Sequence, residues 1–366
     1  MAGLYFHIPF CRKKCSYCDF HFSTTFESYR NKLLNAMVLE LKERIPLITL
    51  PLTSVYFGGG TPSLLTETEL AKFLKNVPSL DEVQEITLEV NPEDLTIDNL
   101  TTWQQLGINR LSIGIQSLNE ALLKWMNRNH TAKDAIHNLR HLSHFSFNCS
   151  VDLIYGIPGQ TVNDLLAVKE IIEKPYINHV SAYALSVENK TLLAYSEAKS
   201  GSPLLDENHQ SRHYYEVQQL LAKFNYEQYE VSSYARNKTY AKHNQNYWKR
   251  VPYLGIGPGA HSYDGKKIRR WNVSNNFSYM QQQNWFEEET LTDDNLWNEL
   301  WLTSLRTCNG VDMELLASFG GLRTKEHQLL EELIRTGDLV QNNHHYQLTR
   351  QGLLKADRFS ALFFRI

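Results

Sequence analysis

The chain has 366 residues, 42% of them hydrophobic and 21% charged, which is the composition of a globular protein with room for one large domain and a smaller one. A formal net charge of −3 gives no support to a surface that binds nucleic acid or anionic membranes. No apolar run reaches the roughly 18 residues that span a bilayer, and the first residues do not resemble a signal peptide. We expect a cytoplasmic protein without stable membrane insertion, while transient association with a membrane stays open.

The first 190 or so residues alternate short apolar runs with segments of helical spacing. The expected strands are 4–8, 54–57, 85–90, 110–115, 148–155 and 179–185. The expected helices between them are 29–45, 66–74, 97–106, 119–126, 132–142 and 162–172. Six strand–helix units in sequence predict a parallel sheet, which either closes into a partial barrel or winds as an open sheet.

Unusual residues at the ends of these strands favour the barrel. They are the segments Cys11–Cys18 and Gly58–Thr61, and the residues Glu89, Gln116, Asp152 and Gly156. Loops at the carboxyl ends of barrel strands are where such folds build their sites, although each glycine or polar residue alone would also suit a simple turn. The predicted fold is α/β, a partial (βα)6 TIM-like barrel.

Beyond about residue 200 the strand–helix rhythm changes. We expect helices over 214–224, 295–304, 324–336 and 353–364, a strand over 228–233, and a hairpin formed by 339–340 and 345–348. This ending predicts a C-terminal α+β, winged-helix-like module. Such modules often bind DNA, but acidic residues make this one a poor phosphate-binding surface, so no nucleic-acid partner is expected. We expect the barrel to span residues 1–235 and the C-terminal domain 236–366.

Cysteine usage indicates a metal site in a reducing compartment. The chain has five cysteines, and Cys11, Cys15 and Cys18 are clustered while Cys149 and Cys308 stand alone. An odd number with this clustering is not the pattern of a secreted disulfide framework. We expect the two isolated cysteines to be buried and to pack as small apolar side chains.

The clustered cysteines have CxxxCxxC spacing. Three thiolates on a tight loop can hold three irons of a 4Fe–4S cluster and leave the fourth iron open. The three basic residues between Cys11 and Cys15 are expected to lower the pKa values of the thiols. From spacing alone a zinc site stays open, with its fourth ligand supplied by His7 or His21.

A glycine-rich segment, Gly58-Gly-Gly-Thr-Pro62, follows the second expected strand. Together with CxxxCxxC near the start of a barrel, it resembles the radical S-adenosylmethionine (SAM) superfamily. The resemblance implies that the open iron binds the amino and carboxylate groups of the methionine part of SAM. It also implies close approach of the glycine-rich backbone to SAM, which requires residues without blocking side chains.

Further motifs make the resemblance narrower. YFHIPFC at 5–11, FGGGTP at 57–62, EVNP at 89–92, GIQ at 114–116, NR at 127–128 and DLIYG at 152–156 resemble the family of oxygen-independent coproporphyrinogen III oxidase and its relatives. By that resemblance, the residues around SAM would be Tyr5, Tyr17, Gly59, Gly60, Thr61, Glu89, Gln116, Arg128 and Asp152. A carboxylate can accept from the methionine amino group, and a guanidinium can pair with the methionine carboxylate. Taken singly, such charges would be ordinary solvated side chains.

The chain departs from the oxidase pattern two residues after Cys18. The oxidase motif has a fourth cysteine there, whereas this chain has Phe20, and its cysteines also begin earlier in the chain. Both features resemble the sister group of HemW-type heme chaperones. The segment from His243 to Trp248 matches the HNxxYW motif of that group. The resemblance implies heme binding, with His243 able to ligate iron and with Tyr247 and Trp248 able to stack on the porphyrin. An ordinary loop histidine and core aromatics are the alternative.

Two functions follow from the resemblance. The favoured one is a heme chaperone that binds a 4Fe–4S cluster, SAM and heme and hands heme to acceptors such as respiratory heme proteins, with a residual radical SAM activity left open. The other is an enzyme in which cluster-reduced SAM yields a 5′-deoxyadenosyl radical that starts the decarboxylation of coproporphyrinogen to protoporphyrinogen IX. Phe20 and the HNxxYW motif favour the chaperone.

Overall fold

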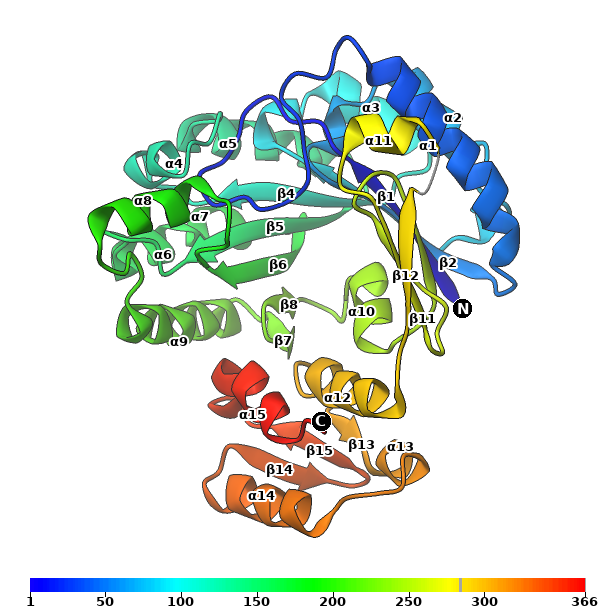
Figure 1. The fold of residues 1–366 in the computed structure, drawn as a ribbon. Helices are drawn as coiled ribbons and strands as arrows, with labels where there is room; N and C mark the ends of the chain where they lie inside the picture. Colours follow the sequence, from blue (N-terminus) through cyan, green and yellow to red (C-terminus); the bar gives the residue numbers. More distant parts are fainter. Residues whose placement is uncertain (283–284, 366) are drawn as a thin grey trace.

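The computed structural model describes residues 1–282 and 285–365. Within them, twelve strands form one curved sheet in the order β12-β11-β10-β9-β1-β2-β3-β4-β5-β6-β8-β7. The strands from β1 to β6 run parallel and follow the six predicted units: β1 (Ala2–Ile8), β2 (Leu52–Gly59), β3 (Glu85–Val90), β4 (Arg110–Gln116), β5 (Asn148–Tyr155) and β6 (Ile177–Ala184). The predicted partial barrel is therefore confirmed, and Figure 1 shows helices surrounding its curved sheet.

The helices alternate with these strands as predicted. They are α1 (Arg30–Arg44), α2 (Glu67–Leu74), α3 (Ile97–Gln105), α4 (Glu120–Trp125), α5 (Ala132–Leu139), α6 (Val162–Ala167) and α7 (Lys169–Ile172). The capping box that predicted the start of α2 is present, since Thr66 and Glu69 bond each other's backbone N–H groups. One helix predicted over 162–172 is two, α6 and α7.

Side chains alternate between the two faces of the sheet. The face that packs against the helices carries apolar side chains, and the face that lines the barrel interior carries polar or aromatic ones. On β1, Leu4, Phe6 and Ile8 are fully buried, and the Phe6 ring stacks on Phe57 of β2 at 4.7 Å. The intervening Tyr5 instead stacks on Tyr56 at 5.9 Å. This alternation of period two places a core outside the sheet and a polar interior within it.

Further strands extend the sheet at both edges. β7 (Glu227–Glu230) and β8 (Ser233–Ala235) replace the single predicted strand over 228–233, and β9 (Tyr253–Ile256), β10 (His261–Tyr263), β11 (Ile268–Asn272) and β12 (Phe286–Thr290) follow. β9 runs parallel to β1, so the expected domain division at residue 236 falls between strands of one sheet. The helices of this region are α8 (Leu192–Ser200), α9 (Glu207–Lys223), α10 (Lys242–Trp248) and α11 (Asn276–Met280).

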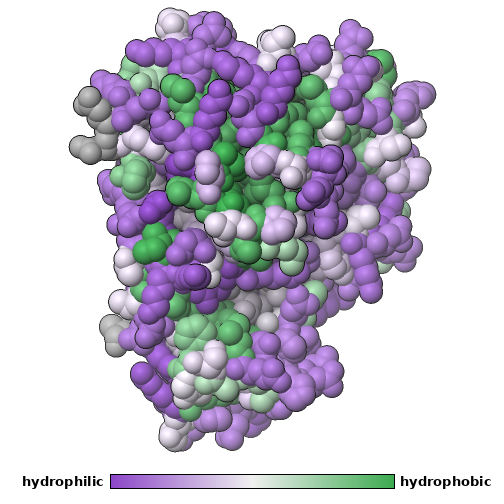
Figure 2. Space-filling model, turned by 90° about the vertical axis from the view of Figure 1, so that its right-hand side faces the viewer, coloured by the Kyte–Doolittle hydropathy of each residue, from purple (hydrophilic) through white to green (hydrophobic). Residues whose placement is uncertain are grey.

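A separate apolar core marks the C-terminal domain, which forms the narrower lower part in Figures 1 and 2. Its centre is a stack of Trp301 on Phe363 with ring centroids 3.8 Å apart, next to Trp297. The predicted helices and hairpin are present. The elements are α12 (Asp293–Ser304), β13 (Val311–Asp312), α13 (Met313–Ser318), α14 (Thr324–Arg335), β14 (Leu339–Asn342), β15 (His345–Leu348) and α15 (Ala356–Leu362).

The surface seen in Figure 2 is mostly hydrophilic, with apolar residues gathered in a hollow above the C-terminal domain. Across the described residues, no helix combines the length and the apolar character needed to cross a membrane.

Candidate functional site

A cavity of about 420 Å³ lies at the carboxyl ends of the parallel strands. Its size is that of a pocket for a small molecule or cofactor. Its walls bring together most of the predicted site residues: Cys11, Cys15, Tyr17, Cys18, Gly59, Gly60, Thr61, Glu89, Gln116, Arg128 and Asp152. The carboxyl ends of the strands and the loops that follow them thus meet at the cavity where the sequence analysis expected a site. Tyr5 and the HNxxYW residues do not line this cavity.

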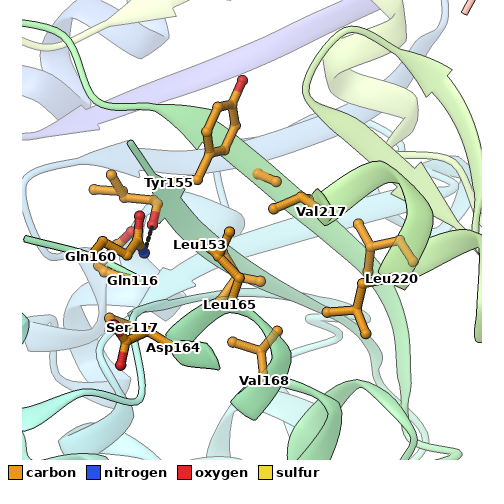
Figure 3. Close-up of a pocket in the computed structure, with 13 residues that line it drawn as sticks. Gln116, Ser117, Leu153, Tyr155, Gln160, Asp164, Leu165, Val168, Val217 and Leu220 are labelled. Atoms are coloured by element: carbon orange, nitrogen blue, oxygen red, sulfur yellow. Dashed lines mark hydrogen bonds between the residues drawn. The ribbon is translucent and has the colours of Figure 1, made fainter. Parts of the chain in front are cut away.

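A second, much smaller space, drawn in Figure 3, shares part of its lining with the main cavity. Its volume is about 10 Å³, and Leu153, Leu165, Val168 and Leu220 contribute to its apolar lining. This is room for about one water molecule. Gln116 borders both spaces. The chemistry belongs to the larger cavity, because only there do thiols, carboxylates and a guanidinium meet.

The three cysteines lie on the loop between β1 and α1, where all are partly exposed free thiols. The backbone N–H of Cys11 donates to the carbonyl of Ser23 at 3.0 Å, which folds the loop back on itself. The Thr61 hydroxyl lies 3.6 Å from the sulfur of Cys11, and Nη1 of Arg128 lies 3.4 Å from that of Cys15. Hydroxyl and guanidinium donors at these distances suit sulfur atoms that carry negative charge.

The expectation that nearby cations lower the thiol pKa values was wrong for two of the three cysteines. Burial raises the pKa of Cys11 to about 11 and that of Cys18 to about 12. Arg12 pairs with Asp94 at 2.6 Å, which neutralises part of its charge. Binding of a metal centre must therefore displace these thiol protons.

The histidines considered as zinc ligands both have other partners. Nε2 of His7 lies 2.8 Å from the carbonyl of His21, and Nδ1 lies 3.2 Å from the Tyr5 hydroxyl. Nε2 of His21 lies 2.7 Å from Oδ1 of Asn276. Burial lowers the pKa of His7 to about 4. Neither histidine is free to complete a four-ligand zinc site, so the three thiols fit iron–sulfur chemistry better.

The glycine-rich segment at the end of β2 lies directly against the cysteine loop. Gly60 donates to the carbonyl of Ile8 at 2.8 Å, and Thr61 donates to that of Phe10 at 2.7 Å. A Cβ atom on Gly60 would stand 2.6 Å from the Phe10 oxygen and 3.0 Å from the Cys11 sulfur. Glycine is therefore required here for the approach of the cysteine loop itself.

Two carboxylates, both partly buried, stand in the cavity wall. Burial raises the pKa of Glu89 to about 7, although Tyr56 donates to it at 2.7 Å and opposes this shift. Burial also raises the pKa of Asp152, whose oxygens accept from the Ser112 hydroxyl at 3.1 and 3.2 Å. Two partly desolvated carboxylates in one cavity favour a cationic ligand. The ammonium and sulfonium groups of SAM meet that requirement.

Arg128 connects the cysteine loop with the strand ends. Its Nη2 donates to Oδ1 of Asn91 and to the carbonyl of Gly114, both at 2.8 Å. Its Nε is buried without a hydrogen-bond partner among the described residues. Gln116, at the irregular end of β4, has a φ of 66°, which is strained for a residue other than glycine. Both features are typical of a ligand site.

Sequence reasoning missed the residues that hold these groups in place, namely Tyr56 and Ser112. Each lies two residues before a motif glycine, Gly58 or Gly114, on the same strand. Because strand side chains alternate with a period of two, these positions share the inner face with the motif. The two-residue spacing from a motif glycine is the sequence signal that could have identified Tyr56 and Ser112 as site residues.

The HNxxYW motif lies at the opposite, amino-terminal end of the barrel. His243 is 1% exposed, its Nδ1 lies 2.8 Å from Oγ of Ser54, and its Nε2 lies 2.9 Å from the Tyr247 hydroxyl. Burial lowers the pKa of His243 to about 3. Tyr5 stacks on this histidine at 6.3 Å. Trp248 instead faces a cleft beside the C-terminal domain.

Comparison with known proteins agrees with this geometry. The radical SAM superfamily model matches residues 5–172, and the HemN C-terminal domain model matches residues 291–354. The heme chaperone HemW of Bacillus subtilis is 31% identical over 99% of each chain. The mitochondrial radical S-adenosyl methionine domain-containing protein 1 of Bos taurus is 32% identical over 97% of this chain and 82% of that protein.

Among solved structures, the radical SAM coproporphyrinogen III oxidase HemN of Escherichia coli matches 99% of this chain and 89% of its own with a TM-score of 0.82. At 22% identity this match shows the fold. The fold implies a 4Fe–4S cluster and SAM, and the cavity holds the three thiols of Cys11, Cys15 and Cys18 together with carboxylates. The chain belongs to the radical SAM superfamily, in the family of the HemW heme chaperones.

Proposed function

We propose that this chain is a heme chaperone that carries a 4Fe–4S cluster on Cys11, Cys15 and Cys18, binds SAM beside the cluster, and hands heme to acceptor heme proteins. The observation that carries this proposal is its similarity to heme chaperones over the full chain. Phe20 supports it, because a 59% exposed phenylalanine lines the cavity where the oxidase motif has a fourth cysteine.

Each side of the cavity has a role in this proposal. Glu89 and Asp152 would face the positive groups of SAM, and Arg128 would pair with its methionine carboxylate. The backbone of the segment 59–61 would approach the methionine part, with Tyr17 and Gln116 completing the wall. The cluster, when bound, supplies the electron that radical SAM proteins use to cleave SAM.

We infer further that the protein works in the cytoplasm and takes up heme without stable membrane insertion. The five free thiols support a reducing compartment. Respiratory heme proteins are the proposed acceptors, and contact with a membrane during transfer is compatible with this assignment.

The porphyrinogen oxidase is the second candidate, and the specific observation in its favour is the shared fold with the E. coli oxidase. Both candidates need the cluster and SAM, so they differ in what happens to porphyrin. An oxidase turns over coproporphyrinogen III, whereas a chaperone binds heme stoichiometrically and releases it to an apoprotein.

The test uses anaerobically reconstituted full-length protein with the cluster loaded. One sample is titrated with heme and then mixed with an apo heme protein, and transfer is followed by heme absorbance. A second sample receives SAM, a reductant and coproporphyrinogen III. We expect stoichiometric heme binding and transfer without decarboxylation. Repeated turnover to protoporphyrinogen IX would overturn the chaperone assignment.

A further inference from the structure

A cleft between the barrel and the C-terminal domain remains without a role in cluster or SAM binding. Its volume is about 220 Å³, and it is lined by α10, the turn before it, α12 and the turn that follows α12. In Figure 1, α10 lies directly above α12. The aromatic and aliphatic part of the lining consists of Tyr229, Tyr240, Trp248, Leu300 and Leu315.

Helix α10 divides the HNxxYW motif between two environments. His243 and Tyr247 point into the barrel interior, where they bond to each other and His243 also bonds to Ser54. Trp248 and Lys249 line the cleft. Ligation of heme iron by His243 would require breaking one of its two hydrogen bonds and exposing a residue that is now 1% exposed. Ligand access therefore exists on the Trp248 side of the helix.

The cleft offers flat aromatic surfaces. The ring of Tyr240 stacks on Tyr229 with centroids 4.3 Å apart. The ring of Trp248 lies 5.3 Å from the Arg306 guanidinium, which holds it from the side of the C-terminal domain. Rings fixed by such contacts can bind a planar macrocycle at little cost in side-chain entropy.

The rim carries one cation that can pair with a carboxylate, near Glu227, whose own carboxylate accepts from the Tyr240 hydroxyl at 2.9 Å. Lys249 is exposed and has no ion pair within the described residues, so its ammonium group is available. The neighbouring Arg250 already has partners for its charge, because it donates to the Tyr263 hydroxyl at 3.1 Å and forms an ion pair with Glu299 at 3.8 Å. One unpaired cation beside two aromatic rings complements a flat apolar ligand with an acidic edge.

We propose that this cleft holds one edge of the heme, with Trp248 and Tyr240 against the ring face and Lys249 paired with a propionate. The inference rests on the proposed function and assigns its heme site. The cleft is smaller than the roughly 300–1,000 Å³ of pockets that enclose a small ligand, so much of the heme stays exposed. Partial exposure suits a carrier, because an acceptor can contact the heme before release.

Cys308 provides a direct probe of this site. Its thiol was expected to be buried, but the residue is exposed and lines the cleft. Cys149 is 1% exposed, and the other three cysteines are the cluster ligands. In cluster-loaded protein, N-ethylmaleimide should therefore modify Cys308 first, and bound heme should shield it.

The first experiment measures heme affinity by titration of cluster-loaded protein with ferric heme. We expect Trp248→Leu and Tyr240→Leu each to raise Kd about tenfold and Lys249→Glu about threefold. Tyr195→Leu removes an aromatic ring that is 69% exposed outside the cleft and is the control. Iron content and SAM affinity, measured on every variant, should match the wild type and show that the barrel is intact.

If the cleft variants bound heme with the Kd of the wild type, the inference would be overturned. The contradiction would be most direct if His243→Gln were the one variant that lost heme binding. Failure of the wild type itself to bind heme would overturn the proposed function.

The second experiment follows alkylation of Cys308 by peptide mass spectrometry, with and without saturating heme. We expect heme to slow the reaction at least tenfold in the wild type. An unchanged rate at full heme occupancy would place the heme elsewhere and overturn the inference.

Discussion

The backbone of Gly60 lies so close to the cysteine loop that one added methyl group does not fit. We expect Gly60→Ala to push the loop away, because the new Cβ would stand 2.6 Å from the Phe10 carbonyl oxygen. Iron and sulfide per chain after anaerobic reconstitution should fall well below the wild-type values. Gly201→Ala is the control: its φ of 69° makes alanine strained by about 1 kcal/mol, but nothing lies within 4 Å of its added Cβ. Normal cluster content in the Gly60 variant would contradict this account.

Glu89 gives the site a pH dependence. With a pKa of about 7, this carboxyl is half protonated near neutrality. A cation binds the carboxylate form, so the affinity for SAM should rise with pH and level off above this pKa. Tyr56→Phe removes a hydrogen bond that lowers the pKa of Glu89, so the midpoint should move to higher pH. Calorimetric SAM titrations of cluster-loaded protein between pH 6 and about 9 measure it; identical midpoints would contradict the role given to Tyr56.

At the scale of elements, the alternation of strands and helices was predictable because each segment carries its own periodicity. β3 and β5 have the bounds that the sequence indicates. β9 was missed, since Tyr253–Ile256 is four residues long and bordered by proline and glycine, which locally resembles a loop. Its place beside β1 depends on a pairing across about 250 residues, and local patterns do not encode such contacts.

The candidate site shows the same limit. Residues that end parallel strands could be brought together from sequence, because strand ends meet at one edge. The motif on α10 could not be placed, since a histidine in a short helix has no sequence signal that separates an exposed ligand from a buried, hydrogen-bonded side chain. Its position depends on Glu85 of β3, whose carboxylate accepts from the backbone N–H groups of Lys242 and His243, both at 2.9 Å.

Glu85 therefore fixes the start of α10 from another element. Its side chain also lies 4.0 Å from Arg110, and both residues are buried. We expect Glu85→Gln to destabilise the protein by about 3 kcal/mol because it leaves the Arg110 charge without its buried counterion. The thermal midpoint should fall by about 4 °C. Glu67→Gln, in the exposed first turn of α2, is the control, with a change within about 0.5 kcal/mol. Equal midpoints for the two variants would remove Glu85 as the anchor of α10.

At the scale of the whole molecule, the barrel separates two hollows of different chemistry. The cavity at its carboxyl end brings three thiols together with carboxylates and Arg128, whereas the cleft at its amino end is lined by aromatic rings, Lys249 and the single thiol of Cys308. Side chains of the barrel interior connect them. Tyr56 bonds to Glu89 of the cavity, and its ring lies 5.0 Å from that of His243 on α10. These interior side chains give a ligand in one hollow a path by which it can influence the other.

This separation predicts that SAM and heme bind at the same time. Their competition can be measured by titrating cluster-loaded protein with SAM at increasing fixed concentrations of heme. If heme occupied the main cavity, the apparent Kd for SAM would rise in proportion to the heme concentration without limit. Binding at opposite ends of the barrel allows only coupling, so the apparent Kd should reach a plateau once heme saturates its own site. By reciprocity, SAM must then change heme affinity by the same factor. We expect that plateau, and in Tyr56→Phe a plateau of different height, since this variant alters the interior contact between the two sites.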